Sequence, residues 1–230
     1  MLGLYIGIIL LLNIPYVQHR MSVLVAKELS TVLGSELTVG RINIGLLNRI
    51  IIDDLVLNDQ LGKELLKIGR LSAKFEILPL FSGKISIGNV QLFSFNANLE
   101  RPTPQASTNF QFVLDAFASK DTVKKKSNLD LRINSLLIRR GKVSYDVLSA
   151  ESTPGKFNPQ HIRLSNILAN VSLKALQNDS VNAAIKRMSV EEEHSGFELK
   201  KLSLKIIAND RKMRIENFAI DLPNTSLAMD

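Results

Sequence analysis

Side chains capable of acid–base, nucleophilic or metal chemistry are scattered along this chain and form no catalytic motif. The three histidines, His19, His161 and His194, have no Cys, Asp or Glu at metal-ligand spacing. Glu191–His194 is followed closely by a glycine, which is typical of a solvated turn. Asp53 and Asp54 are neighbours in an extended segment, so we expect their carboxylates to point to opposite faces and not to work as an acid–base pair.

Other kinds of site are disfavoured by composition and spacing. The chain has no cysteine, which excludes disulfides and thiolate metal sites. Its glycines are isolated, and no serine lies in a nucleophile elbow, so phosphate loops, dinucleotide fingerprints and serine-hydrolase motifs are missing from the sequence. We therefore expect no catalytic residue, no metal and no cofactor, and we do not expect an enzyme.

The charge balance is basic, with 29 Lys and Arg against 22 Asp and Glu and a net charge of +7. Basic side chains alternate with apolar ones and do not form one dense stripe, and no aromatic residues interleave them as a stacking platform for bases. We expect a solvated face, or attraction to anionic lipid head groups, and no nucleic-acid partner.

One phrase, apolar-x-apolar-x-x-apolar-x-apolar, recurs along the chain. In Leu129–Tyr145 the alternation slips at Asn134-Ser135 and then resumes. Alternate residues of a strand share a face, and a β-bulge absorbs the extra residue while the apolar face stays continuous. Further copies are Ile85–Leu92, Ile162–Ala169, Ala183–Val190, Phe197–Ile206 and Met213–Ile220, with similar steps at Gly40-Arg41, Asp53-Asp54 and Gly69-Arg70. The repeat predicts a mainly β fold, a long bent antiparallel sheet with one apolar face and one polar face.

The first residues are hydrophobic. Leu2–Ile14 is apolar but shorter than the ~20 residues that cross a bilayer, and a secretory signal peptide fits poorly because no basic leader precedes it. Two interpretations of this segment stay open. It is either a short, complete hydrophobic element or the remainder of a longer membrane span, and we favour the second. Taken alone, the positive charge at His19-Arg20 would place the following segment in the cytoplasm.

An amphipathic helix is predicted next, as a lid over the mouth of the sheet or a cap on its edge. Its expected apolar face is Val17, Met21, Leu24, Val25, Leu29, Val32 and Leu33, with Gln18, Lys27 and Glu28 turned away and Gly34 as C-cap. A hairpin turn is predicted at residues 58–63 and loops at 78–83, 120–128 and 149–160. A short helix is expected within Thr108–Phe117, with Asn109 as N-cap and Phe110, Val113, Leu114 and Phe117 on one face.

We divide the chain into a hydrophobic membrane anchor at residues 1–17, a helix at 18–34, and a β-domain at 35–230. Because Thr225–Asp230 stops in the middle of an alternation, we expect the sheet to continue beyond this sequence.

Several short motifs occur in a fixed order. They are NIPYVQ at 13–18, GSELTVGRINI at 34–44, DDLVL at 53–57 with the turn at 59–62, GKISI at 83–87, NFQFVL at 109–114 and GKVSY at 141–145. In this order they resemble the start of TamB/AsmA-like proteins, most closely the TamB type of Bacteroidetes. The resemblance covers most of the chain and is strongest between Leu12 and Tyr145. The span is shorter than in the family, and the C-terminal domain of TamB has no counterpart here.

The resemblance implies a single-pass inner-membrane anchor, a body in the periplasm, and an open apolar groove of the β-taco type. This location overrules the orientation suggested by charge alone. In the superfamily, which includes chorein-type bridge proteins, the groove is thought to carry phospholipid acyl chains between membranes. TamB is also associated with outer-membrane protein assembly and secretion, alongside an outer-membrane partner of the Omp85 class. The chain would be the membrane-proximal end of such a bridge.

We expect the groove lining to contact acyl chains without doing chemistry on them. The predicted lining is Ile85, Ile87, Val90, Leu92, Leu131, Ile133, Leu136 and Ile138. Each buried lipid methylene would contribute ~0.8 kcal/mol. Two alternatives stay open: a scaffold that pairs its sheet edge with client β-strands, and a closed structural β-domain whose aliphatic residues are core, with no cargo.

Overall fold

A computed structural model describes residues 3, 7, 10–45, 48–76, 85–117, 129–130, 134–177, 180–208 and 212–229. The predicted loops at 78–83 and 120–128 lie outside these residues. The elements are α2 (Pro15–Leu33), β1 (Leu37–Gly45), β2 (Arg49–Asn58), β3 (Glu64–Glu76), β4 (Ile85–Arg101), α4 (Gln111–Phe117), β5 (Leu129–Asp130), β6 (Ser135–Val147), β7 (His161–Gln177), β8 (Ser180–Glu192), β9 (Phe197–Ala208), β10 (Met213–Leu222) and β11 (Thr225–Met229).

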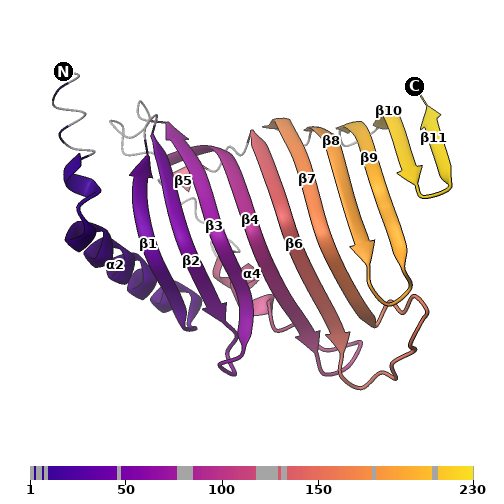
Figure 1. The fold of residues 1–230 in the computed structure, drawn as a ribbon, viewed down its shortest axis with the longest axis horizontal. Coiled ribbons are helices and arrows are strands. Elements are labelled where there is room, and N and C mark those ends of the chain that lie inside the picture. Colours follow the sequence, from indigo (N-terminus) through magenta and orange to yellow (C-terminus); the bar gives the residue numbers. More distant parts are fainter. Residues whose placement is uncertain are drawn as a thin grey trace.

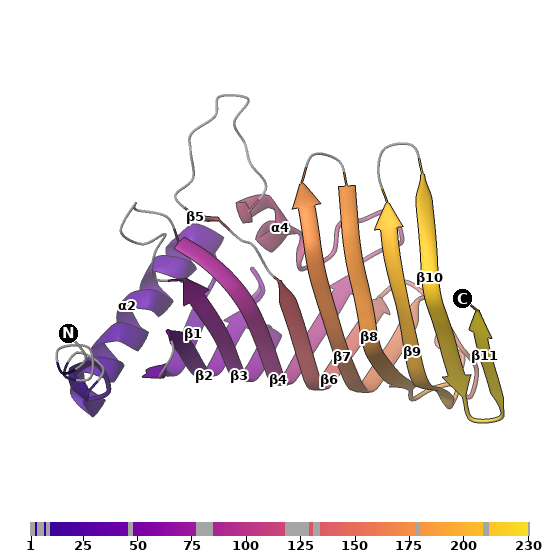
Figure 2. The same ribbon diagram turned by 90° about the horizontal axis from the view of Figure 1, so that it is seen from above.

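The fold is mainly β, as predicted, and consists of one open sheet. Ten strands lie side by side in chain order, from β1 to β4 and then from β6 to β11, while the short β5 pairs with β4 (Figure 1). The strands bow along their length, and β1 and β11 lie at opposite ends of the row (Figure 2). Within the described residues these end strands do not pair with each other, so the sheet is open in this part of the chain.

The sheet is mixed, so the prediction of an antiparallel sheet needs one correction. β4 pairs in parallel with β6, in a register that runs from Asn89 opposite Ser135 to Arg101 opposite Val147. A parallel neighbour requires a crossover of a dozen or more residues, and residues 102–134, which include α4, separate the two strands. Every other neighbouring pair in the row of ten is antiparallel.

The predicted steps lie inside the strands. Those at Ser165-Asn166 and Glu216-Asn217 are β-bulges that shift the register, whereas the step at Asp53-Asp54 is a left-handed residue without a register shift. At Asp53-Asp54, Ser165-Asn166 and Glu216-Asn217 the second residue is left-handed, with φ of 56°, 52° and 53°. In the β8–β9 register, the step at Lys186-Arg187 adds one residue to β8 and the step at Lys200-Lys201 adds one residue to β9, and Gly88 is extra against β3. In β6 the left-handed residue is Arg140, not the predicted Asn134-Ser135, because β6 begins only at Ser135. Ser94 of β4 is also left-handed, with φ 54°, which the sequence did not indicate.

Glycines face the left-handed residues on neighbouring strands. Gly40 of β1 lies opposite Asp54, and Gly69 of β3 lies between Asp54 and Ser94. A Cβ on Gly40 would lie 3.0 Å from the Asp54 Cβ, and one on Gly69 would lie 3.3 Å from the Ser94 Cβ. The left-handed Asp54 and Ser94 can therefore lie at one height without shifting the register, because the neighbouring strands carry glycines opposite them.

Helix α2 runs along the edge strand β1 (Figure 1). It ends as predicted at Gly34, which is left-handed with φ 64° and donates its N–H to the Ser30 carbonyl. The prediction of its buried face was only partly right: Leu33 is buried and Leu29 packs against the core, but Gln18 and Ser22 are also buried, whereas Leu24 and Val32 are exposed.

Hydrogen bonding along the edge of β1 explains this rotation of α2. The free N–H and C=O groups of an edge strand need polar partners. Asn13 Nδ2 donates to the Ile44 carbonyl at 2.8 Å, and Ser30 Oγ accepts the Leu37 N–H at 2.9 Å. Gln18 Nε2 donates to Asn43 Oδ1 at 2.6 Å. Polar side chains therefore face β1, and much of the aliphatic stripe is left outside.

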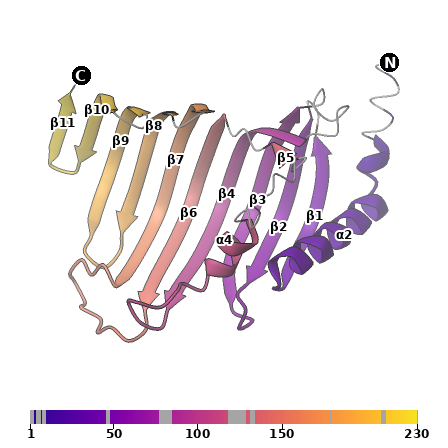
Figure 3. The same ribbon diagram turned by 180° about the vertical axis from the view of Figure 1, so that it is seen from behind.

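Helix α4 lies on the face of the sheet that is nearer the viewer in Figure 3. Phe110, Phe112 and Val113 pack, together with α2, against a buried cluster of Leu33, Leu37, Leu57 and Leu65. Leu114 is 52% exposed, contrary to expectation. Asn109 does not cap the helix; its side chain accepts the Glu100 N–H at 3.0 Å and donates to the Asn98 carbonyl. In the described part of the chain no helix combines the length and apolarity needed to cross a membrane.

Candidate functional site

One face of the sheet carries an unbroken row of apolar side chains across all ten strands. Residues paired in register on neighbouring strands point to the same face, so the row can be followed from partner to partner. We call it the apolar row; its members are Ile42, Ile52, Leu71, Leu92, Ile138, Ala169, Met188, Leu202, Ile220 and Leu227.

A second row runs parallel to the first over eight strands. It consists of Ile44, Ile50, Ala73, Val90, Leu136, Val171, Ile185 and Leu204. A one-residue slip in register would turn a strand's apolar set to the opposite face. The bulges prevent this, because each adds one residue and so keeps the apolar phase on the same face on both sides of the bend.

Four of the eight predicted lining residues are brought together in these rows. Val90 pairs with Leu136 and Leu92 pairs with Ile138 across the parallel β4–β6 junction. Ile85 and Ile87 lie in the first three residues of β4, but the structure does not describe their side chains. Leu131 and Ile133 lie outside the described residues. The prediction missed that the same rows continue through β7–β10, where the sequence phrase repeats and the lining could have been extended.

Exposure of the apolar row changes across the sheet. Ile42 is 3% exposed near α2, most of the row is half-buried, and Leu227 on β11 is 51% exposed. α2 and α4 cover part of this face on β1–β4, where they pack against the cluster around Leu37 and Leu57. The line of left-handed residues separates this cluster from the apolar row. At about 4.8 Å per strand the row is roughly 43 Å long, and one leaflet's acyl chain, about 15 Å or half the hydrocarbon core, would cover about three strands.

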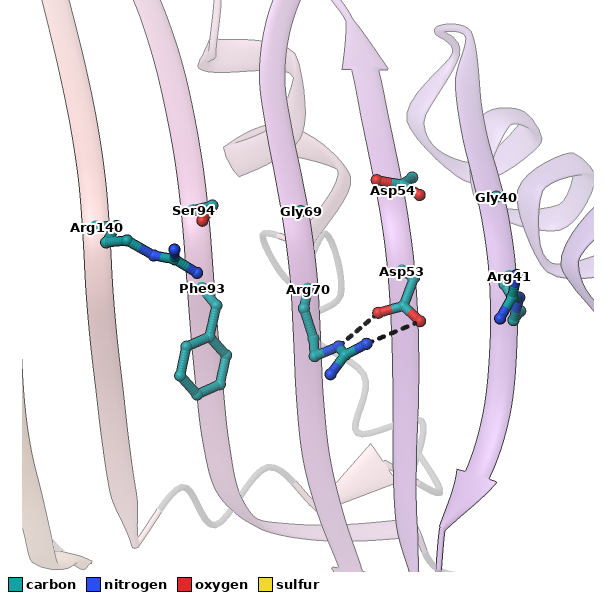
Figure 4. Close-up of a pocket in the computed structure, with 9 residues that line it drawn as sticks. All are labelled: Gly40, Arg41, Asp53, Asp54, Gly69, Arg70, Phe93, Ser94 and Arg140. Carbon is teal, nitrogen blue, oxygen red and sulfur yellow. Dashed lines mark hydrogen bonds and ion pairs between the residues drawn. The ribbon is translucent and has the colours of Figure 1, made fainter.

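The opposite face has a hollow of about 670 Å³ at the line of bulges (Figure 4). Its walls carry Arg41, Asp53, Asp54, Arg70 and Arg140, and the side-chain-free positions of Gly40 and Gly69 give it depth. In this view α4 lies behind the sheet, so the hollow and the apolar row are on different faces (Figure 4).

Both aspartates line this hollow, so the expectation that they point to opposite faces was wrong. The left-handed φ of Asp54 changes the direction of the chain between them. Arg70 binds Asp53 through two hydrogen bonds of 2.6 and 3.3 Å, and the Asp53 carboxylate raises the pKa of Arg70. Because Asp53 is held by Arg70, it is poorly placed as a general base. Within the described residues Arg41 and Arg140 have no ion-pair partner.

Two carboxylates near the loop-bearing ends of β6–β9 are tied into polar networks. Asp146 accepts from His161 Nδ1 and Arg163 at 2.8 Å each. Burial acts to raise the pKa of Asp146, but these hydrogen bonds outweigh it and lower that pKa. The hydrogen bond to Asp146, with a second to the Ala150 carbonyl, raises the pKa of His161. Both ring nitrogens of His161 face acceptors, an arrangement that only the protonated ring satisfies fully, which agrees with the raised pKa.

The second of these two carboxylates is Glu192. The expectation of a solvated turn at Glu191–His194 was wrong for this residue. Its side chain is 2% exposed and accepts from Ser195 Oγ and N, His194 N and Arg163 N. Burial acts to raise its pKa, but these hydrogen bonds outweigh it and lower the pKa to about 2. Across the described ranges no three His, Asp or Glu side chains gather closely enough to hold a metal ion.

Sequence comparisons with known proteins found no match. No family model matches the chain, and no curated protein matches it in sequence.

Proposed function

We propose that this chain is the membrane-proximal part of an inner-membrane-anchored periplasmic protein of the TamB/AsmA-like type. It would carry phospholipid acyl chains between the inner and outer membranes, support outer-membrane protein assembly and secretion, or do both. The single observation that supports the proposal is the apolar row: its members are paired in register across ten strands, all of them are apolar, and most are half-buried. An extended apolar surface of this kind usually marks a binding site.

The bulges support the groove form of the proposal. A bulge bends its strand and increases the local twist, and here the register shifts between most neighbouring strands from β2 to β10. The left-handed Asp54 and Ser94 lie at one further height in β2 and β4. If the strands bend toward the apolar face, the two rows form the floor of a β-taco groove. Acyl chains would lie across the strands, with head groups at the rim.

A paired substitution in β6 tests this proposal. Leu136→Glu places a carboxylate in the second row, whereas Leu137→Glu places it on the opposite face, next to Gln91 and Asn170. The protein is purified from cells, and bound lipid is quantified by extraction and native mass spectrometry, with thermal unfolding to confirm folding. Lipid lost from Leu136→Glu alone supports the proposal. Equal lipid in both folded variants, or none in the parent, contradicts it.

A second function is favoured by β11, all five residues of which are exposed. An edge strand of this kind can add a client strand by backbone hydrogen bonding, which would make the chain an assembly scaffold. Ala228→Pro removes one backbone donor from that edge and should abolish client binding. Leu136→Glu should leave such binding unchanged, which separates the two functions.

A further inference from the structure

Helix α2 carries large apolar side chains that do not contact the sheet. Tyr16 is 66% exposed, Val23 53%, Leu24 61% and Val32 57%, and Leu10, Leu11 and Ile14 before the helix are 45–65% exposed. The buried side of the helix is formed by Gln18, Ser22, Ala26, Leu29 and Leu33, at spacings of three and four residues. The exposed apolar residues therefore belong to a different helical face, which nothing in the described chain covers.

This outer face also carries cationic side chains. Tyr16, Arg20, Val23 and Lys27 are separated by four, three and four residues, so they lie one above the other on one face. The Arg20 guanidinium lies 5.5 Å from the centre of the Tyr16 ring, and Arg20 Nε donates to the Tyr16 hydroxyl. The one acidic residue of the helix, Glu28, lies on this face too, between Leu24 and Val32 and four residues from each.

We propose that this outer face of α2 lies on an anionic phospholipid bilayer, parallel to its surface. Aliphatic side chains would enter the acyl boundary, Tyr16 would occupy the head-group level, and Arg20 and Lys27 would reach lipid phosphates while their stems stay apolar. Charge complementarity favours a membrane over a protein partner, because each basic residue near an anionic surface adds about 1 kcal/mol, a figure equivalent to about fivefold in binding.

Continuity with the preceding sequence also favours a membrane. The exposed Leu10, Leu11 and Ile14 connect this face to the apolar run that begins at Leu2. A helix bound in this way would hold β1, and with it the covered end of the sheet, beside the bilayer. This end of the apolar row would then be the one that receives lipid, a consequence that rests on the proposed function. The membrane contact itself does not rest on it.

The chain contains no tryptophan, so one introduced Trp reports its own surroundings. Leu24→Trp places the reporter on the outer face of α2. Phe197→Trp, at a position 48% exposed at the start of β9, is the matched control. The full chain is mixed with vesicles of phosphatidylcholine and phosphatidylglycerol that carry brominated acyl chains. We expect a blue shift and bromine quenching for Leu24→Trp and neither for Phe197→Trp.

Absence of quenching at Leu24→Trp while the protein floats with the vesicles, or failure of the protein to bind them, overturns the proposal. Val23→Trp serves as a second reporter on the same face. Replacing Val23 and Leu24 with Gln should weaken vesicle binding about tenfold or more, whereas Leu148→Gln, at a position 58% exposed in the β6–β7 loop, should not change it.

Leu136→Glu distinguishes this inference from the proposed function. It should abolish bound lipid yet leave the Leu24→Trp signal intact. A chain without groove lipid that still gives the α2 signal refutes the groove alone, and the reverse result refutes only the membrane contact.

Discussion

Glu192→Gln should destabilise the sheet although the two side chains have nearly the same shape. The carboxylate accepts the Ser195 hydroxyl and N–H on one oxygen, at 2.6 and 2.8 Å, and the Arg163 and His194 N–H groups on the other, at 3.2 and 3.3 Å. A glutamine can keep only one oxygen. Its amide nitrogen would face two N–H donors, so two charge-assisted hydrogen bonds are lost. At about 1.5 kcal/mol each, the expected cost is about 3 kcal/mol.

The pH dependence gives a second, independent signature. The pKa of Glu192 is about 2 in the fold, against 4.5 for an unperturbed glutamate. A lowered pKa contributes stability that is complete above the unfolded value and is lost as the pH falls through the folded value. The difference between parent and variant should therefore be constant from pH 7 to about pH 5 and shrink between pH 4.5 and 2.

Urea unfolding followed by circular dichroism, at pH 7 and at pH 3, measures both signatures. Glu193→Gln is the control, because Glu193 is exposed and adjacent. A variant as stable as the parent at pH 7, or a difference that persists undiminished at pH 3, would refute the account of Glu192 as a buried, hydrogen-bonded carboxylate.

Three further predictions concern positions that shape the sheet. The pKa of His161 is raised from 6.5, so its contribution to stability should be complete below pH 6.5 and lost as the pH rises through the folded value; thermal unfolding across this range should show a loss that His161→Gln lacks. Gly141→Ala should cost about 1–3 kcal/mol, because the new Cβ would overlap the Phe95 ring, and the cost should shrink in a Phe95→Leu background. Ser94→Gly should stabilise the protein by about 1 kcal/mol, since φ is 54° there; unchanged stability would show that the left-handed residue carries no strain.

The alternation and its polar two-residue steps were enough to predict the strands and many of the bulges. Each step must be absorbed if the apolar face is to stay continuous, so Asp53-Asp54 and Ser165-Asn166 could be identified from spacing alone. Asn and Asp tolerate the left-handed conformation. Ser94 and Arg140 gave no such signal, and these bulges are fixed by pairing with neighbouring strands, which no local pattern contains.

The errors have a common origin in contacts between distant segments. The parallel β4–β6 pair was signalled only by the length of residues 102–134. The orientation of α2 depends on hydrogen bonds from Asn13, Gln18 and Ser30 to the edge of β1, so apolar periodicity pointed to the wrong face. The burial of Glu192 depends on Arg163, which lies on another strand. For the lining, the sequence indicated Val90, Leu92, Leu136 and Ile138, and the register extended the row to β11.

The most direct measurement of the central claim is photo-crosslinking from the apolar row to lipid in cells. A benzophenone amino acid replaces Leu202, a half-buried member of the row on β9, and in a matched variant it replaces Ser203, whose side chain lies on the opposite face. The account predicts phospholipid adducts, detected by mass spectrometry, at position 202 and not at 203. Equal adducts at both positions, or adducts at neither, would contradict an acyl-chain-binding face.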